Sequence, residues 1–393
     1  MFISLNLIQS LALAVVVLLV GSALKKKIGF LKKYFIPTPV IGGLIFAVIM
    51  LVGNQTEAWN VELDQSLTDL LLIAFFTATG FAFSVKDLKK TGIIGFKLAV
   101  LTVILVILQN AIVPLISPLA GIDPLLGLTM ASMSMAGGPG TAAAFGPTIE
   151  SMGIENATLV ALSAATYGLV MGSIIGGPVA KYLIKRHKVS SKDVSGTIEL
   201  DLTNKSDGLN EKTLMNSLFI ILLSMGLGTL MVMLLNLTGF IWPDYVGGLF
   251  MAAILRIVFD SMNISINLKS INIIGSIALS LFLALTIMGL EIWHLFDLAL
   301  PMIIVLLIQT IVMILFAIFI IYRVMGKNYD AVVMSSGMSG VGIGSTPNAV
   351  ANMEAVIEGN GPSPNSMIIL PVIAAVFLSI FNPIIITLFV NIL

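Results

Sequence analysis

Long apolar stretches alternate with short polar ones along this chain, which is typical of a polytopic membrane protein. A helix that crosses a bilayer needs roughly 20 mostly apolar residues. Ten segments of about that length stand out, at 4–24, 36–53, 67–85, 93–117, 157–184, 213–238, 246–263, 274–293, 299–322 and 366–390. Two more stretches, 125–150 and 330–357, are apolar but broken by glycine and small residues. We expect each of these two to form a re-entrant hairpin, so the predicted fold is all-α.

The positive charges predict which side of the membrane each loop faces, because short cytoplasmic loops are rich in Lys and Arg. With the N-terminus outside, Lys25–Lys33, Lys86–Lys97 and Lys181–Lys212 fall inside, and so do Lys269, Arg323 and Lys327. Arg256 lies within a span. The predicted outer loops carry Glu57, Glu62, Asp64, Glu155, Asp244, Glu291 and Asp297. This sorting predicts that both termini are outside, and it requires each hairpin to return to the side it left.

Composition narrows the chemistry further. Of the 393 residues 58% are hydrophobic and only 10% are charged, so lipid must be the main solvent. The net charge is zero, which gives no indication of nucleic-acid binding. The chain has no cysteine and only two histidines, His187 and His294, which argues against thiolate or histidine metal sites and against an organic cofactor chemistry built on them.

The two halves of the chain resemble each other at an offset of about 200 residues. Residues 34–49 echo 241–255, residues 74–83 echo 280–290, and Gln109 echoes Gln309. Each half would hold five spans, an odd number, so the second half enters from the opposite side. We therefore predict two inverted five-helix repeats, a frequent plan of secondary transporters. The predicted organisation is a repeat over 1–184, a cytoplasmic linker over 185–212 and a second repeat over 213–393.

The glycine-rich hairpins are the predicted binding site. Glycine and proline at membrane depth are tolerated where the freed backbone lines a cavity. We expect Thr141 and Thr346 to cap two half-helices, whose positive ends would converge on a carboxylate. The candidate substrate-binding residues are Ser134, Gly137, Gly138, Gly140, Thr141, Gly340, Gly342, Gly344, Ser345, Thr346 and Asn348. The neutral oxygens of Asn352, Ser339 and Thr141 are the candidate sodium ligands. The alternative is that these small residues only pack helices closely.

Other patterns favour structural interpretations. Gly168, Gly172 and Gly176 form overlapping GxxxG steps, which favour tight helix packing. The GxSG pattern at Ser339 resembles that of an intramembrane serine protease, but neither histidine is placed to reach it, so an enzyme is not expected. Residues 138–143 fit a loose dinucleotide pattern by chance. Arg256 and Asp260, four residues apart, are expected to neutralise each other on one helix face.

Several strings together resemble the bacterial sodium–glutamate symporter family over nearly the whole chain. They are FLKKYFIPTPVIGGL (30–44), AFFTATG (74–80), AGGPGTAAAF (136–145), GLVMGSIIGGPVAKYL (168–183), ALSLFLALTIMGL (278–290), YRVMGKNYDAVV (322–333) and SGVGIGSTPNAVANM (339–353). One departure is Pro139, where members often have histidine.

The resemblance implies import of L-glutamate driven by sodium across the bacterial inner membrane. It also implies a homodimer in lipid and an elevator motion, in which a transport domain slides against a scaffold. From the residues alone, a carrier of another small carboxylate such as citrate or malate is the alternative, since helix termini would serve any such anion. An ion channel is disfavoured, because pores are usually repeated about an axis normal to the membrane.

Overall fold

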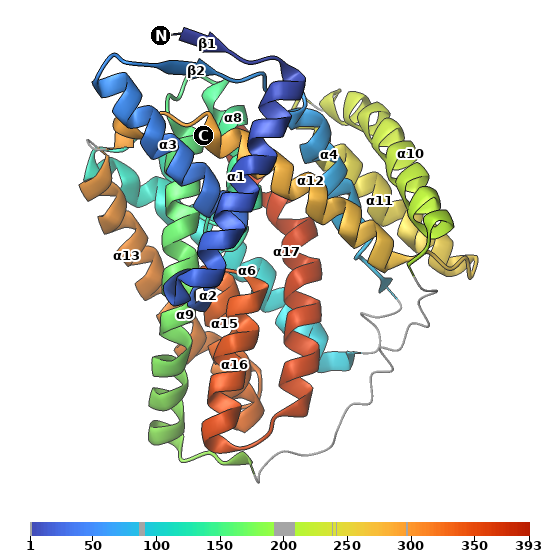
Figure 1. The fold of residues 1–393 in the computed structure, drawn as a ribbon. Coiled ribbons are helices and arrows are strands. Elements are labelled where there is room, and N and C mark those ends of the chain that lie inside the picture. Colours follow the sequence, from blue (N-terminus) through green and yellow to red (C-terminus); the bar gives the residue numbers. More distant parts are fainter. Residues whose placement is uncertain (1, 86–90, 192–208, 238, 241, 296–297) are drawn as a thin grey trace. The chain divides into compact units, whose positions relative to one another are not determined.

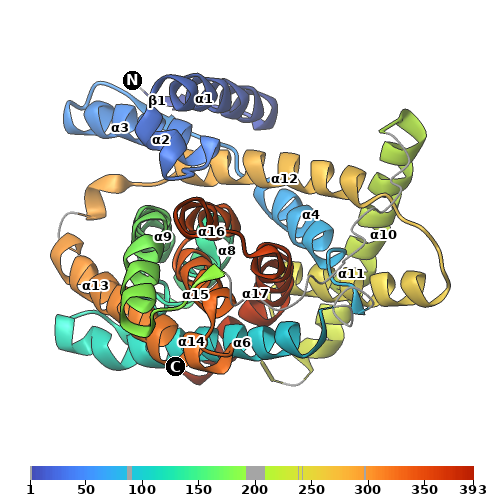
Figure 2. The ribbon, with the colours of Figure 1, turned by 90° about the horizontal axis from the view of Figure 1, so that it is seen from below.

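The computed structural model describes residues 2–85, 91–191, 209–237, 239–240, 242–295 and 298–393. Within this part the chain is almost entirely helical (Figures 1 and 2). Its contacts divide it into two compact units, and each unit combines segments from both halves of the sequence. Unit 1 comprises Met1–Ser84 and Thr203–Leu298, and unit 2 comprises Val85–Leu202 and Ala299–Leu393.

Unit 1 is a bundle of helices with one small strand pair. Its elements are β1 (Phe2–Ser4), α1 (Leu7–Lys27), α2 (Gly29–Lys33), α3 (Thr38–Gln55), β2 (Asn60–Glu62), α4 (Thr68–Gly80), α10 (Glu211–Asn236), α11 (Asp244–Ser261), α12 (Leu268–Met288) and the 3-10 turn Ile292–Leu295. Parallel pairing of β1 with β2 joins Ile3 to Val61 and was not expected from the sequence. It ties the N-terminus to the loop between α3 and α4.

The helices of unit 1 pack in two matching sets. Helix α1 packs on α3, and α10 packs on α11, in each case through glycines that bring the backbones together. A Cβ on Gly42 would lie 2.1 Å from the carbonyl oxygen of Val17, and a Cβ on Gly247 would lie 2.2 Å from that of Gly228. These approaches are closer than any side chain permits. Both α3 and α11 are 18 residues long and follow an extended proline, Pro37 or Pro243.

Unit 2 holds both glycine-rich stretches. Its elements are α6 (Gly92–Ile116), the 3-10 turn η1 (Ser117–Ala120), α7 (Pro124–Leu128), α8 (Gly138–Glu150), α9 (Ala157–His187), α13 (Ala299–Phe316), the π-helical turn η4 (Ala317–Ile321), α14 (Tyr322–Val324), α15 (Tyr329–Gly342), α16 (Thr346–Asn360) and α17 (Pro364–Ile392). Every residue of α15 is buried, because α9, α16 and α17 pack around it. Two of its serines bond carbonyls of their own helix, Ser335 that of Ala331 and Ser339 that of Ser335, and Ser336 donates to the carbonyl of Asn352 on α16 at 3.4 Å.

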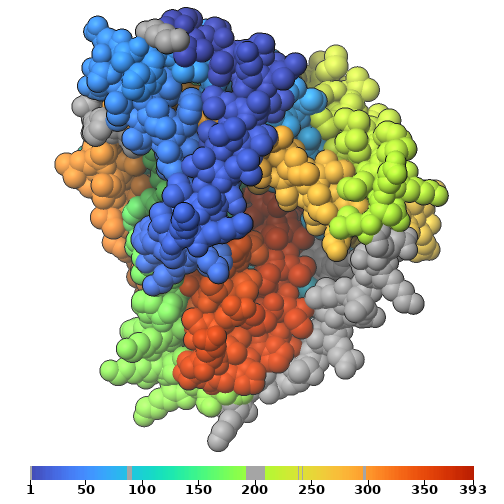
Figure 3. Space-filling view, viewed as in Figure 1, coloured from blue at the N-terminus to red at the C-terminus, as the bar shows by residue number. Residues whose placement is uncertain are grey.

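Eight helices among the described residues are long and apolar enough to cross a membrane. They match eight of the ten predicted spans. The remaining two predicted spans are also helical, but α4 has 13 residues, fewer than a crossing takes, and α11 carries three charged residues, Asp244, Arg256 and Asp260. Large apolar side chains point outward along α10, with Leu223, Met233 and Leu234 each 67% exposed, and this helix forms the yellow-green surface in Figure 3. Such a surface suits lipid.

Candidate functional site

The second glycine-rich stretch forms a tight pair of helices. Helix α15 ends at Gly342, three residues follow, and α16 begins at Thr346 and packs back against α15. Gly340 makes this possible, because a Cβ there would lie 2.7 Å from the backbone nitrogen of Ala349. At 14 and 15 residues, each helix is shorter than a membrane crossing needs.

The start of α16 differs by one residue from the predicted cap. Ser345 is the extended residue before the helix, Thr346 is its first residue, and Pro347 lies in the first turn, where a missing N–H costs nothing. Neither hydroxyl caps the helix: the Ser345 Oγ donates instead to Oδ1 of Asn348 at 3.2 Å. The prediction that Thr346 caps α16 was therefore wrong, whereas the predicted helix start near that residue is confirmed.

The first glycine-rich stretch has a different form. A short α7 is followed by turns over 129–137, and α8 begins at Gly138 with Gly137 before it. Gly138 has a φ of +67°, a conformation that side chains resist. Thr141 lies inside α8 and its hydroxyl donates to the carbonyl of Gly137 at 3.1 Å, so it is not the cap that we predicted. Pro139, the departure from the family pattern, is buried in the first turn of α8.

The two helix starts meet inside unit 2. A Cβ built on Gly138 would lie 3.5 Å from the carbonyl oxygen of Gly344, so the first residue of α8 touches the break between α15 and α16. Gly137, Gly140, Ser345 and Thr346 are half-buried and Pro347 is exposed, so the junction is reachable from outside the unit's core. Two helix N-termini that converge in this way provide backbone N–H groups and positive dipole ends, which suit an anion.

Helix α9 braces this junction. Its glycines 168, 172 and 176 face the α15–α16 pair, and a Cβ on Gly168 would lie 2.2 Å from the carbonyl oxygen of Ile343. Two asparagines of α16 reach the α9 backbone: Asn348 Nδ2 donates to the carbonyl of Leu169 at 2.8 Å, and Asn352 Nδ2 to that of Gly172 at 2.7 Å. The GxxxG steps are packing residues, as predicted, and the surface they pack is the candidate site itself.

The other predicted site residues have structural partners within unit 2. The Ser134 hydroxyl donates to the carbonyls of Thr129 and Ala161, which fixes the turns before α8. Ser339 bonds Ser335, and Gly342 touches the Met313 and Leu105 side chains with ordinary negative φ. Of the glycines at the two breaks, Gly138 is the one with a positive φ. The candidate sodium ligands Asn352, Ser339 and Thr141 bond different backbone carbonyls.

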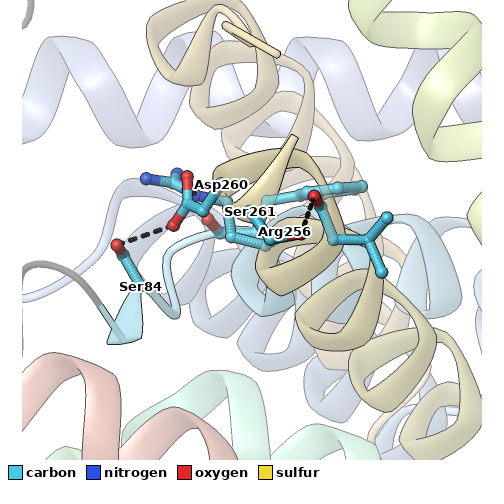
Figure 4. Close-up of polar contacts among 6 residues, drawn as sticks. Ser84, Arg256, Asp260 and Ser261 are labelled. Atoms are coloured by element: carbon cyan, nitrogen blue, oxygen red, sulfur yellow. Dashed lines mark hydrogen bonds and ion pairs between the residues drawn. The ribbon is translucent and has the colours of Figure 1, made fainter. Parts of the chain in front are cut away.

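The predicted pairing of Arg256 with Asp260 is present in unit 1 (Figure 4). Arg256 Nε lies 3.0 Å from Asp260 Oδ1, and Arg256 Nη1 donates to the Phe81 carbonyl at 3.1 Å. Ser84 donates to the other carboxylate oxygen of Asp260 at 2.8 Å. The pair therefore holds the end of α4, which the sequence did not indicate. Within the described residues, no group of three or more acidic, His or Cys side chains could hold a metal ion.

In the described residues, neither histidine lies beside Ser339, the serine of the protease-like GxSG pattern. The Ser339 hydroxyl is directed at its own helix, and the His187 ring packs on Tyr322 with centroids 4.6 Å apart. His294 lies beside Glu291 in unit 1.

Eight helices long and apolar enough to cross a membrane, together with the match to a symporter family, identify a multi-pass inner-membrane protein of the transporter class. The sodium/glutamate symporter family model matches residues 3–362. A sodium/glutamate symporter of Escherichia coli (strain K12) is 39% identical over 391 residues, covering 98% of this chain and 97% of that protein. One of Haemophilus influenzae is 35% identical over 381 residues, covering 95% and 94%. The chain belongs to the sodium/glutamate symporter family.

Proposed function

We propose that this protein imports L-glutamate together with sodium. The observation that carries the proposal is the contact between the starts of α8 and α16, since converging helix N-termini can bind a carboxylate without a buried arginine. Family membership favours glutamate over citrate or malate, because the relatives above are named for sodium and glutamate. The substrate residues remain those of the two breaks, with Gly138, Gly344 and Ser345 at their centre.

The coupling ion follows from the kind of oxygen atoms at the breaks. Hydroxyl, amide and carbonyl groups surround them, and Asn352, Ser339 and Thr141 are the proposed sodium ligands. A proton-driven carrier would need a titrating group there. The acidic residues of the two helices nearest the break along the chain are Asp330, in the first turn of α15, and Glu354, in the middle of α16, and neither lies in the three residues that join the helices.

The two compact units suit an elevator. Unit 2 would be the transport domain, because it contains both breaks and the α9 helix that braces them, and unit 1 would be the scaffold. The matched packing of α1 on α3 and of α10 on α11 supports the inverted repeat. The short α15 and α16 support a re-entrant hairpin. We include a homodimer in the same proposal, because the resemblance to the family implies one.

Uptake of labelled glutamate into proteoliposomes tests this function. We expect accumulation with an inward sodium gradient, little with potassium in its place, and competition by unlabelled glutamate but not by citrate or malate. Uptake that persists without sodium and follows a pH gradient would reject the proposed coupling. Sodium-driven uptake of citrate in place of glutamate would reject the proposed substrate.

A further inference from the structure

Two glutamines meet in the interior of unit 2, one from each half of the chain. Gln109 of α6 and Gln309 of α13 are both fully buried. Gln309 Nε2 donates to the backbone carbonyl of Gln109 at 3.2 Å, and Gln109 Nε2 donates to the carbonyl of Gly342 at 2.8 Å. A continuous chain of hydrogen bonds therefore runs from α13 through α6 to the last residue of α15, next to the break.

In both glutamine side chains the amide nitrogen forms a hydrogen bond and the amide oxygen does not. The Oε1 atoms of Gln109 and Gln309 are buried without a hydrogen-bond partner, and so is Oδ1 of Asn110, the next residue on α6. Because both Nε2 atoms donate to carbonyls, the assignment of oxygen and nitrogen in each amide follows from the hydrogen bonds. A buried amide oxygen that accepts nothing costs free energy, so it needs an explanation, and a bound water or ion is one that would supply the missing partner.

We infer that the Oε1 atoms of Gln109 and Gln309 are ligands of a transported sodium ion, at a site beside the α15–α16 break. Sodium suits neutral amide and carbonyl oxygens, and such oxygens coordinate it in other transporters. The inference rests on the proposed sodium coupling and adds residues that the glycine-rich motifs do not contain.

The position of the site explains how the ion would act on the substrate. Gln109 holds Gly342, and Gly342 is three residues from the extended Ser345 that precedes α16. An ion that fixes the Gln109 side chain would fix the end of α15 and therefore the start of α16, where the glutamate carboxylate is proposed to bind. Coupling of this kind is reciprocal: sodium raises the affinity for glutamate, and glutamate raises the affinity for sodium by the same factor.

The test measures sodium binding apart from transport. Purified protein is unfolded by heat in NaCl or in choline chloride at equal ionic strength, because a ligand that binds the folded state raises Tm. We expect NaCl to stabilise the wild type, and Gln109→Leu or Gln309→Leu to lose that difference. In proteoliposomes at saturating glutamate, the same variants should raise the half-saturating sodium concentration at least about tenfold.

Two controls separate ion binding from general damage. Gln309→Glu keeps a side-chain oxygen of the same reach but gives up the Nε2 donor and adds a negative charge, so NaCl should still raise its Tm, whereas Gln309→Leu should not respond. Thr387→Val removes another buried oxygen of unit 2 that lacks a partner, and it should leave sodium dependence unchanged.

The outcomes are distinguishable. A wild type that sodium neither stabilises nor drives would overturn the proposed function itself. A wild type that responds to sodium, with Gln109→Leu and Gln309→Leu responding equally, would overturn this inference and leave the function standing, with water as the partner of both oxygens.

Discussion

Asn352 on α16 donates a 2.7 Å hydrogen bond to the carbonyl of Gly172 on α9, across 180 residues of sequence. One helical turn further along α9, a Cβ on Gly176 would lie 2.3 Å from the same Nδ2 atom. The amide therefore occupies the space that any side chain at Gly176 would need. Gly176 is a packing residue, as the GxxxG pattern predicted, and the group packed against it is the amide of Asn352.

Gly176→Ala should sharply reduce glutamate uptake, because it displaces Asn352 and with it the first turns of α16. Overpacking of a tight core costs about 1–3 kcal/mol. Gly177→Ala is the matched control, since a Cβ at Gly177 meets nothing within 4 Å. Initial uptake rates at equal expression compare the two. Equal rates for both variants would show that the Asn352 contact is not needed.

Two substitutions at the break between α15 and α16 should differ in severity. Thr346→Ala should change the free energy of unfolding by less than about 0.5 kcal/mol, because Thr346 is not the cap and is half-buried. Gly342→Val should impair folding or transport strongly, since a Cβ there would lie 2.6 Å from the Met313 sulfur and 2.8 Å from Leu105.

Uptake and thermal unfolding of these two variants are measured together. If Thr346→Ala lowers uptake more than about tenfold while its Tm is unchanged, the hydroxyl contacts glutamate or sodium directly. If Gly342→Val transports normally, the close packing at the end of α15 is not required.

The ion pair of α11 predicts a double-mutant effect. Asp260→Asn removes the negative charge that lies 3.0 Å from the Arg256 Nε, while the Arg256 side chain stays buried, with 7% exposed. Loss of one partner of a buried pair costs about 3–5 kcal/mol. Arg256→Met with Asp260→Leu should be less destabilised than Asp260→Asn alone, because the double variant no longer buries the Arg256 charge. Tm values of the purified variants decide this, and a double variant less stable than the single one would contradict it.

The predicted orientation can be tested directly because the natural chain has no cysteine. Gln55→Cys, at the end of α3, should react with an impermeant thiol reagent in intact cells, and Lys185→Cys, near the end of α9, should react only after the cells are opened. The parallel pairing of β1 with β2 places the N-terminus on the same side as the Gln55 loop. Ser206, an obvious alternative in the linker, lies outside the described residues. Reversed labelling would invert the topology.

Much of the fold could be predicted because hydrophobic length is a direct signal. Eight spans, the helix start near Thr346 and the Arg256–Asp260 pair all follow from local spacing. The form of the first break, the turns over 129–137 before α8, could not be predicted in this way. These turns depend on the long-range hydrogen bond from the Ser134 hydroxyl to the carbonyl of Ala161. The end of α4 is likewise set by Arg256, which lies 175 residues from Phe81 in sequence.

The sequence predicted where the two breaks in the helices lie, but not the residues that hold them in place. Glycine and proline marked both breaks, because at membrane depth these residues are tolerated where the backbone leaves the helix and lines a cavity. Gln109 and Gln309 stood out only as a repeated residue. Their role depends on a contact between α6 and α13 that no local pattern encodes, although a polar amide in the middle of an apolar span was a usable signal.

The interleaving of the two units also sets the order in which the protein can be made. The ribosome releases α1 to α4 long before α10 to α12, the helices with which they share unit 1. During that interval α6 to α9 emerge and lack α13 to α17, so neither unit can be complete when the first half has entered the membrane. Separately synthesised halves, 1–184 and 213–393, would each lack part of both cores. We therefore expect each half to be degraded when expressed alone and to accumulate when the two are produced together.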